Sequence, residues 1–236
     1  MNRYLSFLFF SLSLFIVFFA LLEYTSMGEY EEDILYLLNE HIVMVVTSCS
    51  FAIVFGISFG VILSRPILNK QAENIMQLFN MSVTIPTLAI LALSMSFLGI
   101  GFLPAVVGLF IATLLPIIKN TFVGINAVSP SIIEAAQGMG MNSFQILIKV
   151  EIPNALYVIF AGIKTAVAIN IGTAPLVFLI GGGGLGELIF SGIDLDIMPM
   201  LLAGAITTGM TAIFADKLVY ILSTIFISRG VSPTED

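Results

Sequence analysis

The chain has 236 residues, of which 58% are hydrophobic and 10% are charged, and its mean hydropathy is +1.10. About a quarter of the residues in an ordinary soluble domain are charged, so this composition excludes that class and predicts an integral membrane protein. The net charge of −7 does not point to a nucleic-acid partner, and the single cysteine, Cys49, excludes an internal disulfide and a cysteine metal cluster.

Six apolar segments are marked off along the chain by charged and turn residues. They cover residues 4–22, 41–64, 74–99, 103–125, 155–180 and 198–226. Each comes close to or exceeds the roughly 20 residues that a helix needs to cross the hydrocarbon core of a bilayer. The expected fold is therefore all-α, with about six transmembrane helices.

The first segment, 4–22, could be taken for a signal peptide because Arg3 precedes it. Its apolar run is longer than is usual for a signal peptide, and no Ala-x-Ala-like site precedes Glu23, so a retained peripheral anchor is favoured. Residues 23–40 are expected to form an acidic external loop, either simply solvated or serving as a docking patch for an external partner. The expected division is an anchor and loop over 1–40, a transmembrane domain over 41–226 and a tail over 227–236.

Lysine and arginine residues predict the orientation in the membrane, because cytoplasmic connections are enriched in them. With the N-terminus in the cytoplasm, the outer loops 23–40, 100–102 and 181–197 contain no Lys or Arg. The residues that then fall inside are Arg3, Arg65, Lys70, Lys119, Lys149 and Arg229. Both termini and the loop before residue 153 are therefore predicted to be cytoplasmic.

Prolines interrupt the third, fourth and fifth segments, at Pro86, Pro104, Pro116 and Pro175. A proline in a membrane helix frees a carbonyl, which is tolerated where protein or a water-filled cavity satisfies it, and interrupted helices often line a transport path. The candidates for such a path are Thr84, Pro86, Asn170 and Thr173. Helix packing by small polar side chains is the alternative.

Two further features are read as structural. The single histidine, His41, lies at a segment edge beside Glu40 and is expected to be an interfacial residue rather than a ligand or proton relay. Gly181–Gly186 is expected to form a tight turn at the outer end of the fifth segment. Glu187 follows where a nucleotide-binding loop has a Lys-Ser/Thr pair, so the chain shows no means of binding ATP itself, and no cofactor or metal is expected.

The connection over residues 127–153 is predicted to carry a short surface helix. Ser129-Pro130-Ser131 is a helix-start sequence, because a serine oxygen can accept from free first-turn N–H groups and proline tolerates that position. Small residues let another backbone approach closely, which suits docking into a groove of a partner. These small residues are Ala135, Ala136, Gly138 and Gly140.

The same connection resembles the EAA loop of binding-protein-dependent ABC importer permeases, through Glu134-Ala135-Ala136, Gly140 and Val150-Glu151-Ile152-Pro153. Flanking motifs from about Thr84 to Ile193 resemble the permease subunits of glycine betaine, choline and carnitine osmoprotectant importers. Those motifs are Thr84–Ala89, Leu115–Thr121, Gly138–Met141, Ile171–Ala174 and Gly181–Gly186. Pro175 departs from the pattern, in which a threonine or similar small residue is expected.

This resemblance implies a type I ABC importer permease fold with a cytoplasmic coupling helix, in a bacterial plasma membrane. A separate ATPase subunit would use ATP and dock on Glu134, Ala135, Ala136 and Gly140, and Pro153 would end the loop. A second permease copy, identical or different, would pair around the path, and an external binding protein would deliver the substrate. Aromatic cages usually select quaternary ammonium ions, and this chain has no Trp, so selection is expected on another polypeptide.

Three alternatives remain open at this stage. The chain could be an ABC permease for another small amine or amino acid. An ion-coupled transporter or channel would need an ion or proton site within the membrane and repeat symmetry, and the sequence shows neither. A membrane scaffold would not need the prolines and polar residues that gather in the third to fifth segments.

Overall fold

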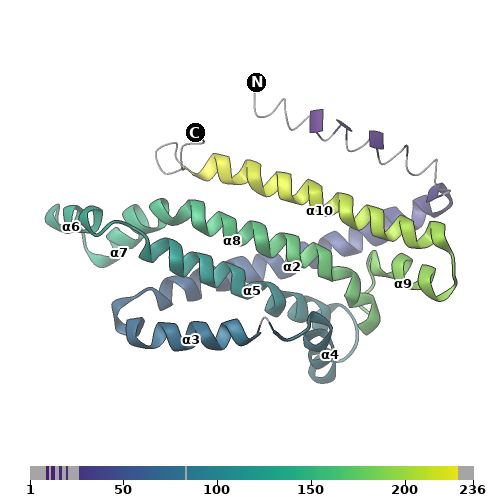
Figure 1. The fold of residues 1–236 in the computed structure, drawn as a ribbon, viewed down its shortest axis with the longest axis horizontal. Coiled ribbons are helices and arrows are strands. Elements are labelled where there is room, and N and C mark those ends of the chain that lie inside the picture. The colour runs from purple at the N-terminus through teal and green to yellow at the C-terminus, as the bar shows by residue number, and fades with distance from the viewer. Residues whose placement is uncertain are drawn as a thin grey trace. The chain divides into compact units, whose positions relative to one another are not determined.

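The computed structural model describes residues 27–82 and 84–227 and, nearer the N-terminus, residues 9, 10, 12, 13, 16, 17 and 20. All regular elements in these residues are helical, as the sequence predicts (Figure 1). The long helices are α2 (Glu31–Leu63), α5 (Phe102–Asn126), α8 (Ile152–Thr173) and α10 (Met198–Phe226). The shorter ones are η1 (Met27–Tyr30), η2 (Pro66–Leu68), α3 (Asn69–Ser82), α4 (Thr87–Leu98), α6 (Pro130–Gly138), α7 (Ser143–Ile146), η3 (Leu147–Glu151), η4 (Ala174–Ile180) and α9 (Gly186–Asp194).

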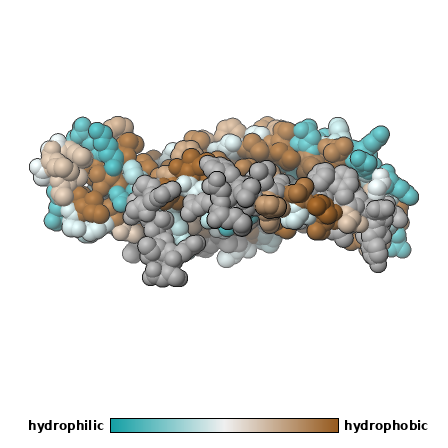
Figure 2. All heavy atoms as spheres, turned by 90° about the horizontal axis from the view of Figure 1, so that it is seen from above, coloured by the Kyte–Doolittle hydropathy of each residue, from teal (hydrophilic) through white to brown (hydrophobic). Residues whose placement is uncertain are grey.

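Four stretches of the described chain are long and apolar enough to cross a membrane. They are Met27–Leu63, Phe102–Asn126, Ser143–Ile180 and Met198–Phe226, and they match the predicted second, fourth, fifth and sixth segments. Many of their large hydrophobic side chains are exposed, and Figure 2 shows hydrophobic residues over much of the visible face. An apolar surface of this kind marks contact with a membrane or a partner. The predicted first segment, 4–22, lies largely outside the described residues.

The prediction of one membrane-spanning helix over residues 74–99 is wrong. The structure divides this segment into α3 and α4, and α4 is too short to cross a bilayer alone. Pro86 precedes the first residue of α4 with an extended backbone, at φ −57° and ψ 136°. Because a proline also disfavours helical geometry in the residue before it, the chain leaves the helix between Ser82 and Thr87.

The prediction of a loop over residues 23–40 is wrong from Met27 onward. Residues Met27–Tyr30 form a 3-10 turn, and α2 begins at Glu31. The acidic residues that suggested a solvated loop lie in the first turn of α2, at Glu31, Glu32 and Asp33. Carboxylates are favourable there, because the free N–H groups of a helix N-terminus carry partial positive charge.

The helices divide into two compact units. The first contains the described residues up to Cys49, with Pro86–Ala112 and Val167–Lys217. Its core joins α2, α4, α5, α8 and η4 through Met44, Val45, Cys49, Leu91, Ala105, Leu109, Ile171, Ala174, Val177 and Ile180. A further cluster packs the start of α2 on α9 and α10, through Met27, Ile34, Leu37, Leu185, Leu188 and Ala203.

The second unit contains Ser50–Ile85, Thr113–Ala166 and the described residues from Leu218 onward. Here α2 packs closely on α5 through Gly56 and Gly60, which form a small-xxx-small pattern. A Cβ added to Gly56 would lie 2.7 Å from the Ile117 side chain, and one added to Gly60 would lie 2.5 Å from that of Thr121. Leu63, Met76 and Ile118 form a cluster beside this contact.

Pro116 lies inside α5 without ending it, in contrast to Pro86. The Asn120 side-chain amide donates to the Pro116 carbonyl at 2.8 Å, so this carbonyl has a polar partner. Gly162 of α8 lies against the same carbonyl, where an added Cβ would be 2.8 Å from the oxygen. The packed protein therefore supplies a side-chain donor to a backbone carbonyl at this proline.

Candidate functional site

The helix predicted within residues 127–153 is present as α6, which begins at Pro130. Ser129 is the residue before it, but its hydroxyl makes no capping bond and lies 2.8 Å from the Ser131 hydroxyl instead. The Ser129 carbonyl accepts from Ile132 N at 3.0 Å and so begins the helical hydrogen bonding. The start is thus placed correctly from sequence, whereas the predicted serine cap is not formed.

Gly140 ends α6 through a Schellman motif. Its φ of +79° lies in the left-handed region, which glycine adopts at little cost. The Gly140 N–H donates to the Gln137 carbonyl at 2.9 Å, and the Met141 N–H donates to the Ala136 carbonyl at 3.2 Å. No atom of the described residues lies within 4 Å of a Cβ built on Gly140, so its backbone conformation, rather than close packing against them, calls for glycine here.

A second helical start follows at once in α7, and sequence reasoning missed it. The Asn142 side chain accepts from Gln145 N at 2.9 Å, and the Gln145 side chain accepts from Asn142 N at 2.9 Å. This reciprocal pair is a capping box, for which Asn followed three residues later by Gln is the sequence signal. The continuous helical stretch that contains the fifth segment therefore starts at Ser143 rather than near residue 155.

Pro153 does not end the loop as predicted, because helix continues through it from Ser143 to Ile180. Proline normally disturbs a helix by lacking an N–H and crowding the carbonyl four residues earlier. Here η3 is a π-helical turn that ends two residues before Pro153, and Ile152 N donates to the Leu147 carbonyl. The Asn154 side chain donates to the Val150 carbonyl at 2.7 Å. These two adjustments accommodate the proline within the helix.

We call the segment formed by α6, α7 and η3 the docking element. Its two arms are held together by a hydrophobic cluster of Ala136, Ile146 and Val150, against which Ile133 and Met141 pack. Ala136 is therefore buried, and the expectation that its side chain forms part of a docking surface is wrong. Glu134, Ala135 and Gly140 are exposed, as that expectation requires.

The docking element also exposes large apolar side chains, which unpartnered water-facing helices rarely do. Met139 and Phe144 are 70% and 71% exposed, and Ile132 and Ile148 are exposed as well. Figure 1 shows α6 and α7 beyond the ends of α5 and α8 in the second unit. The element thus offers exposed apolar side chains and the exposed carboxylate of Glu134, a combination suited to a protein partner.

The four candidates for a transport path fall into two places. Thr84 and Pro86 lie in the exposed turn between α3 and α4. Asn170 and Thr173 lie on α8, where Asn170 is fully buried and bonded to Ser48 of α2, and the Thr173 hydroxyl donates to the Ile169 carbonyl at 2.8 Å. Asn170 thus makes a helix-packing contact in this structure, and the assignment of these residues to a path stays a prediction.

The glycine run at the end of η4 forms a tight turn, as predicted. Gly181, Gly183 and Gly184 all have positive φ angles, and the Glu40 carboxylate accepts from Gly184 N at 3.1 Å. The His41 side chain is 0% exposed under this turn, so it is buried within the protein, and its position at the membrane interface stays a prediction. Pro175 is buried as well. Its carbonyl lies so close to Gly186 that a Cβ on Gly186 would collide with it.

Two features together define the class of protein: several apolar helices long enough to span a membrane, and a compact helical element between two of them that presents an exposed surface. The chain belongs to the family of binding-protein-dependent transport system inner membrane components, whose sequence pattern matches residues 52–229. It is therefore a multi-pass membrane protein and a permease subunit of an ABC transporter.

Relatives and solved structures agree with this family. The chain is 51% identical over 187 residues to the osmoprotectant import permease protein OsmY of Salmonella typhimurium, and the aligned region covers 79% of each chain. It is 37% identical to the glycine betaine/carnitine/choline transport system permease protein OpuCB of Bacillus subtilis, over 85% of this chain and 89% of the relative. A chain of the methionine ABC transporter MetNI in inward-facing conformations has the same fold, with a TM-score of 0.69, 22% identity and coverage of 87% and 99%.

Proposed function

We propose that the chain is the permease subunit of an ATP-driven importer for quaternary ammonium osmoprotectants of the glycine betaine, choline and carnitine class. The observation that carries this proposal is the 51% identity to an osmoprotectant import permease, over most of both chains. Relatives named for carnitine, for choline and for glycine betaine, 37–38% identical, support the same class. The likeness to methionine and amino-acid transporters, at 20–22% identity, supports the fold alone.

A cytoplasmic ATPase subunit is the proposed partner of the docking element. The exposed side chains of Glu134, Met139 and Phe144 support this assignment, because a mixed apolar and charged surface requires a partner of matching chemistry. ATP is bound and hydrolysed by that subunit, and this chain holds no cofactor of its own. A second permease copy and an external binding protein complete the proposed importer.

The proposed mechanism is mechanical. Closure of the two ATPase subunits on ATP moves the docking elements, and the attached helices switch the path from outward to inward access. No bond in the substrate is made or broken by this chain. The distribution of Lys and Arg supports a cytoplasmic location for the docking element, the N-terminus and the C-terminus. The family supports a bacterial plasma membrane.

The first experiment is co-purification of the tagged chain from native membranes, followed by uptake in proteoliposomes. We expect an ATPase and an osmolyte-type binding protein to co-purify, and ATP to drive uptake of at least one of glycine betaine, choline and carnitine. Uptake of a different amine or amino acid, with none of these three, would replace the substrate class. Uptake without any ATPase would contradict an ATP-driven importer and favour an ion-coupled transporter.

The docking assignment has its own test. Glu134→Lys reverses an exposed charge on α6, and we expect it to reduce recovery of the ATPase. Glu187→Lys makes the same change on the exposed first turn of α9, which is predicted to face outward, and serves as the matched control. Equal ATPase recovery with both variants would contradict docking at Glu134.

A further inference from the structure

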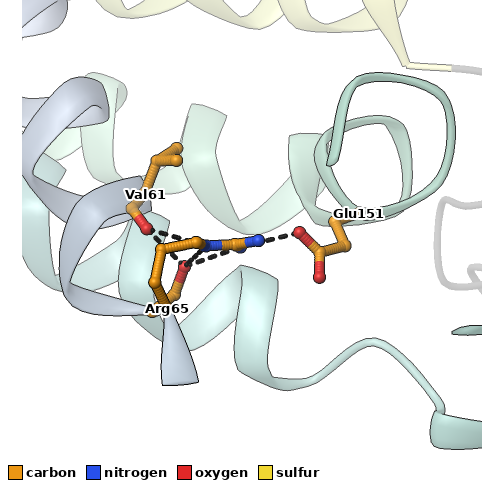
Figure 3. A network of polar contacts seen from close by, with 4 residues as sticks. Val61, Arg65 and Glu151 are labelled. Atoms are coloured by element: carbon orange, nitrogen blue, oxygen red, sulfur yellow. Dashed lines mark hydrogen bonds and ion pairs between the residues drawn. The ribbon is translucent and has the colours of Figure 1, made fainter. Parts of the chain in front are cut away.

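Arg65 stands just beyond the last residue of α2 and makes two kinds of contact there. Its Nε donates to the Val61 carbonyl at 3.2 Å, and its Nη2 donates to the Ser64 hydroxyl at 2.9 Å (Figure 3). Val61 belongs to the last turn of α2, where carbonyls have no partner within the helix. The guanidinium therefore holds the end of α2 and places a positive charge where the helix dipole favours one.

The same guanidinium reaches the docking element. Its Nη2 lies 2.7 Å from Oε2 of Glu151, which is the last residue of η3 and 86 positions away in sequence. The two side chains are only 29% and 12% exposed, so water screens this pair less than a surface ion pair. Charge-assisted contacts of this length are among the stronger hydrogen bonds in proteins.

Glu151 is joined to α6 through its neighbour in the chain. The preceding residue, Val150, is buried in the cluster that contains Ala136 of α6. A continuous chain of contacts therefore runs from α6 through Val150 and Glu151 to Arg65 and the end of α2. All the residues that make this series of contacts belong to the second unit. The π-helical turn that carries Glu151 is itself a form that occurs frequently at functional sites.

We infer that Arg65 and Glu151 form the link that passes movement of the docking element to α2. They are positioning residues: they touch neither substrate nor nucleotide, and they act by holding the end of α2 to η3. The inference rests on the proposed function, because it needs an ATPase that moves α6. Without the ion pair, α2 would follow the docking element less faithfully.

The test uses the complex of the full chain with its ATPase, reconstituted in lipid. Cys49 is the only cysteine of this chain and lies buried on α2, so its reaction with a thiol reagent, followed by mass spectrometry, reports on α2 without any engineered label. We expect ATP with vanadate to change the labelling rate in the natural protein. Glu151→Gln and Arg65→Gln should reduce this change by about fivefold or more, which corresponds to a modest coupling free energy.

Two further variants separate coupling from simple stability. The charge swap Arg65→Glu with Glu151→Arg should restore most of the ATP-dependent change, because it rebuilds the pair with reversed polarity. Lys119→Gln removes an exposed charge on α5 in the same unit and should leave the labelling response unchanged. ATPase recovery and basal hydrolysis are measured for each variant, and the labelling response is compared per recovered ATPase, because Glu151 belongs to the docking element. Only Lys119→Gln should leave both within about twofold.

The outcomes distinguish the inference from the proposed function. The inference would be overturned if ATP with vanadate changed the Cys49 labelling rate in Glu151→Gln as much as in the natural protein. It would also be overturned if the labelling rate of the natural protein did not change. A lost response that the charge swap does not restore would overturn it too. If Cys49 responds and the swap rescues it, yet no osmoprotectant is taken up, the inference stands and the proposed substrate class fails.

Discussion

Ser48 of α2 and Asn170 of α8 are joined by a buried side-chain contact, although 122 positions separate them in sequence. Asn170 Nδ2 lies 2.9 Å from Ser48 Oγ, and Ser48 Oγ lies 3.2 Å from Asn170 Oδ1. The Ser48 hydroxyl also lies 2.8 Å from the Met44 carbonyl of its own helix. Polar contacts of this kind between apolar helices define which faces meet, because an unpaired amide inside a membrane protein is costly.

Removal of the Ser48 hydroxyl should therefore destabilise the protein measurably. We expect Ser48→Ala to lower the free energy of unfolding by about 0.5 to 1.5 kcal/mol, because the Asn170 amide loses a buried partner. Ser58→Ala is the matched control, since Ser58 is exposed on the same helix and donates only to its own helix, at the Val54 carbonyl. Unfolding in mixed detergent micelles measures both; equal losses would mean that the contact with Asn170 contributes nothing.

Gly140 and Gly138 test whether the docking element needs its left-handed turn. In the part of the chain that the structure describes, neither has an atom within 4 Å of an added Cβ, but only Gly140 has a positive φ. Gly140→Ala should cost about 1 to 2 kcal/mol locally and reduce ATPase recovery, whereas Gly140→Asn should be milder because Asn tolerates this conformation.

Gly138→Ala should be neutral or stabilising, because Gly138 has helical geometry. Pull-down of the ATPase at increasing detergent concentration compares the variants. A loss of binding in Gly138→Ala equal to that in Gly140→Ala would show that the partner approaches the backbone closely at both positions, as the sequence suggested.

The close contact between α2 and α5 makes Gly60 sensitive to any side chain. A methyl group there would lie 2.5 Å from Thr121 Cβ and 2.9 Å from the Ile118 carbonyl oxygen, so the helices must separate. We expect Gly60→Ala to destabilise by about 1 to 3 kcal/mol, as overpacking usually does. Gly209→Ala, on α10 with no described atom within 4 Å, should change stability by less than about 0.5 kcal/mol. Thermal melts followed by fluorescence size-exclusion chromatography compare the two variants. Equal melting temperatures for Gly60→Ala and Gly209→Ala would refute the packing argument.

His41 is buried close to the Ile171 backbone, and neither ring nitrogen makes a well-formed hydrogen bond among the described residues. A leucine of similar size removes this unpaired polar group, so His41→Leu should leave stability unchanged or raise it slightly. Met44→Ala, one turn further along the same buried face, should cost about 2 to 5 kcal/mol and show that the region is tightly packed. Strong destabilisation by His41→Leu would show that the imidazole has a partner in the assembled transporter.

The membrane class, most of the long helices, the start of α6 at Pro130 and the glycine turn near residue 184 could be predicted from sequence. These features depend on composition and on interactions within a few residues, such as the φ preference of glycine and the geometry before a proline. The capping box of Asn142 and Gln145 and the Gly56-xxx-Gly60 pattern carry equally local signals, and they were missed although they were present.

Other features were decided only by the tertiary structure. Hydropathy does not reveal that His41 is buried, that Ala136 faces inward, or that Pro153 lies within a continuous helix, because each depends on what packs nearby. The pairs Ser48–Asn170 and Arg65–Glu151 join residues 122 and 86 positions apart. Sequence by itself determined which segments are apolar and where the chain turns; folding decided which polar groups meet, because a buried polar side chain must find its partner in space rather than along the chain.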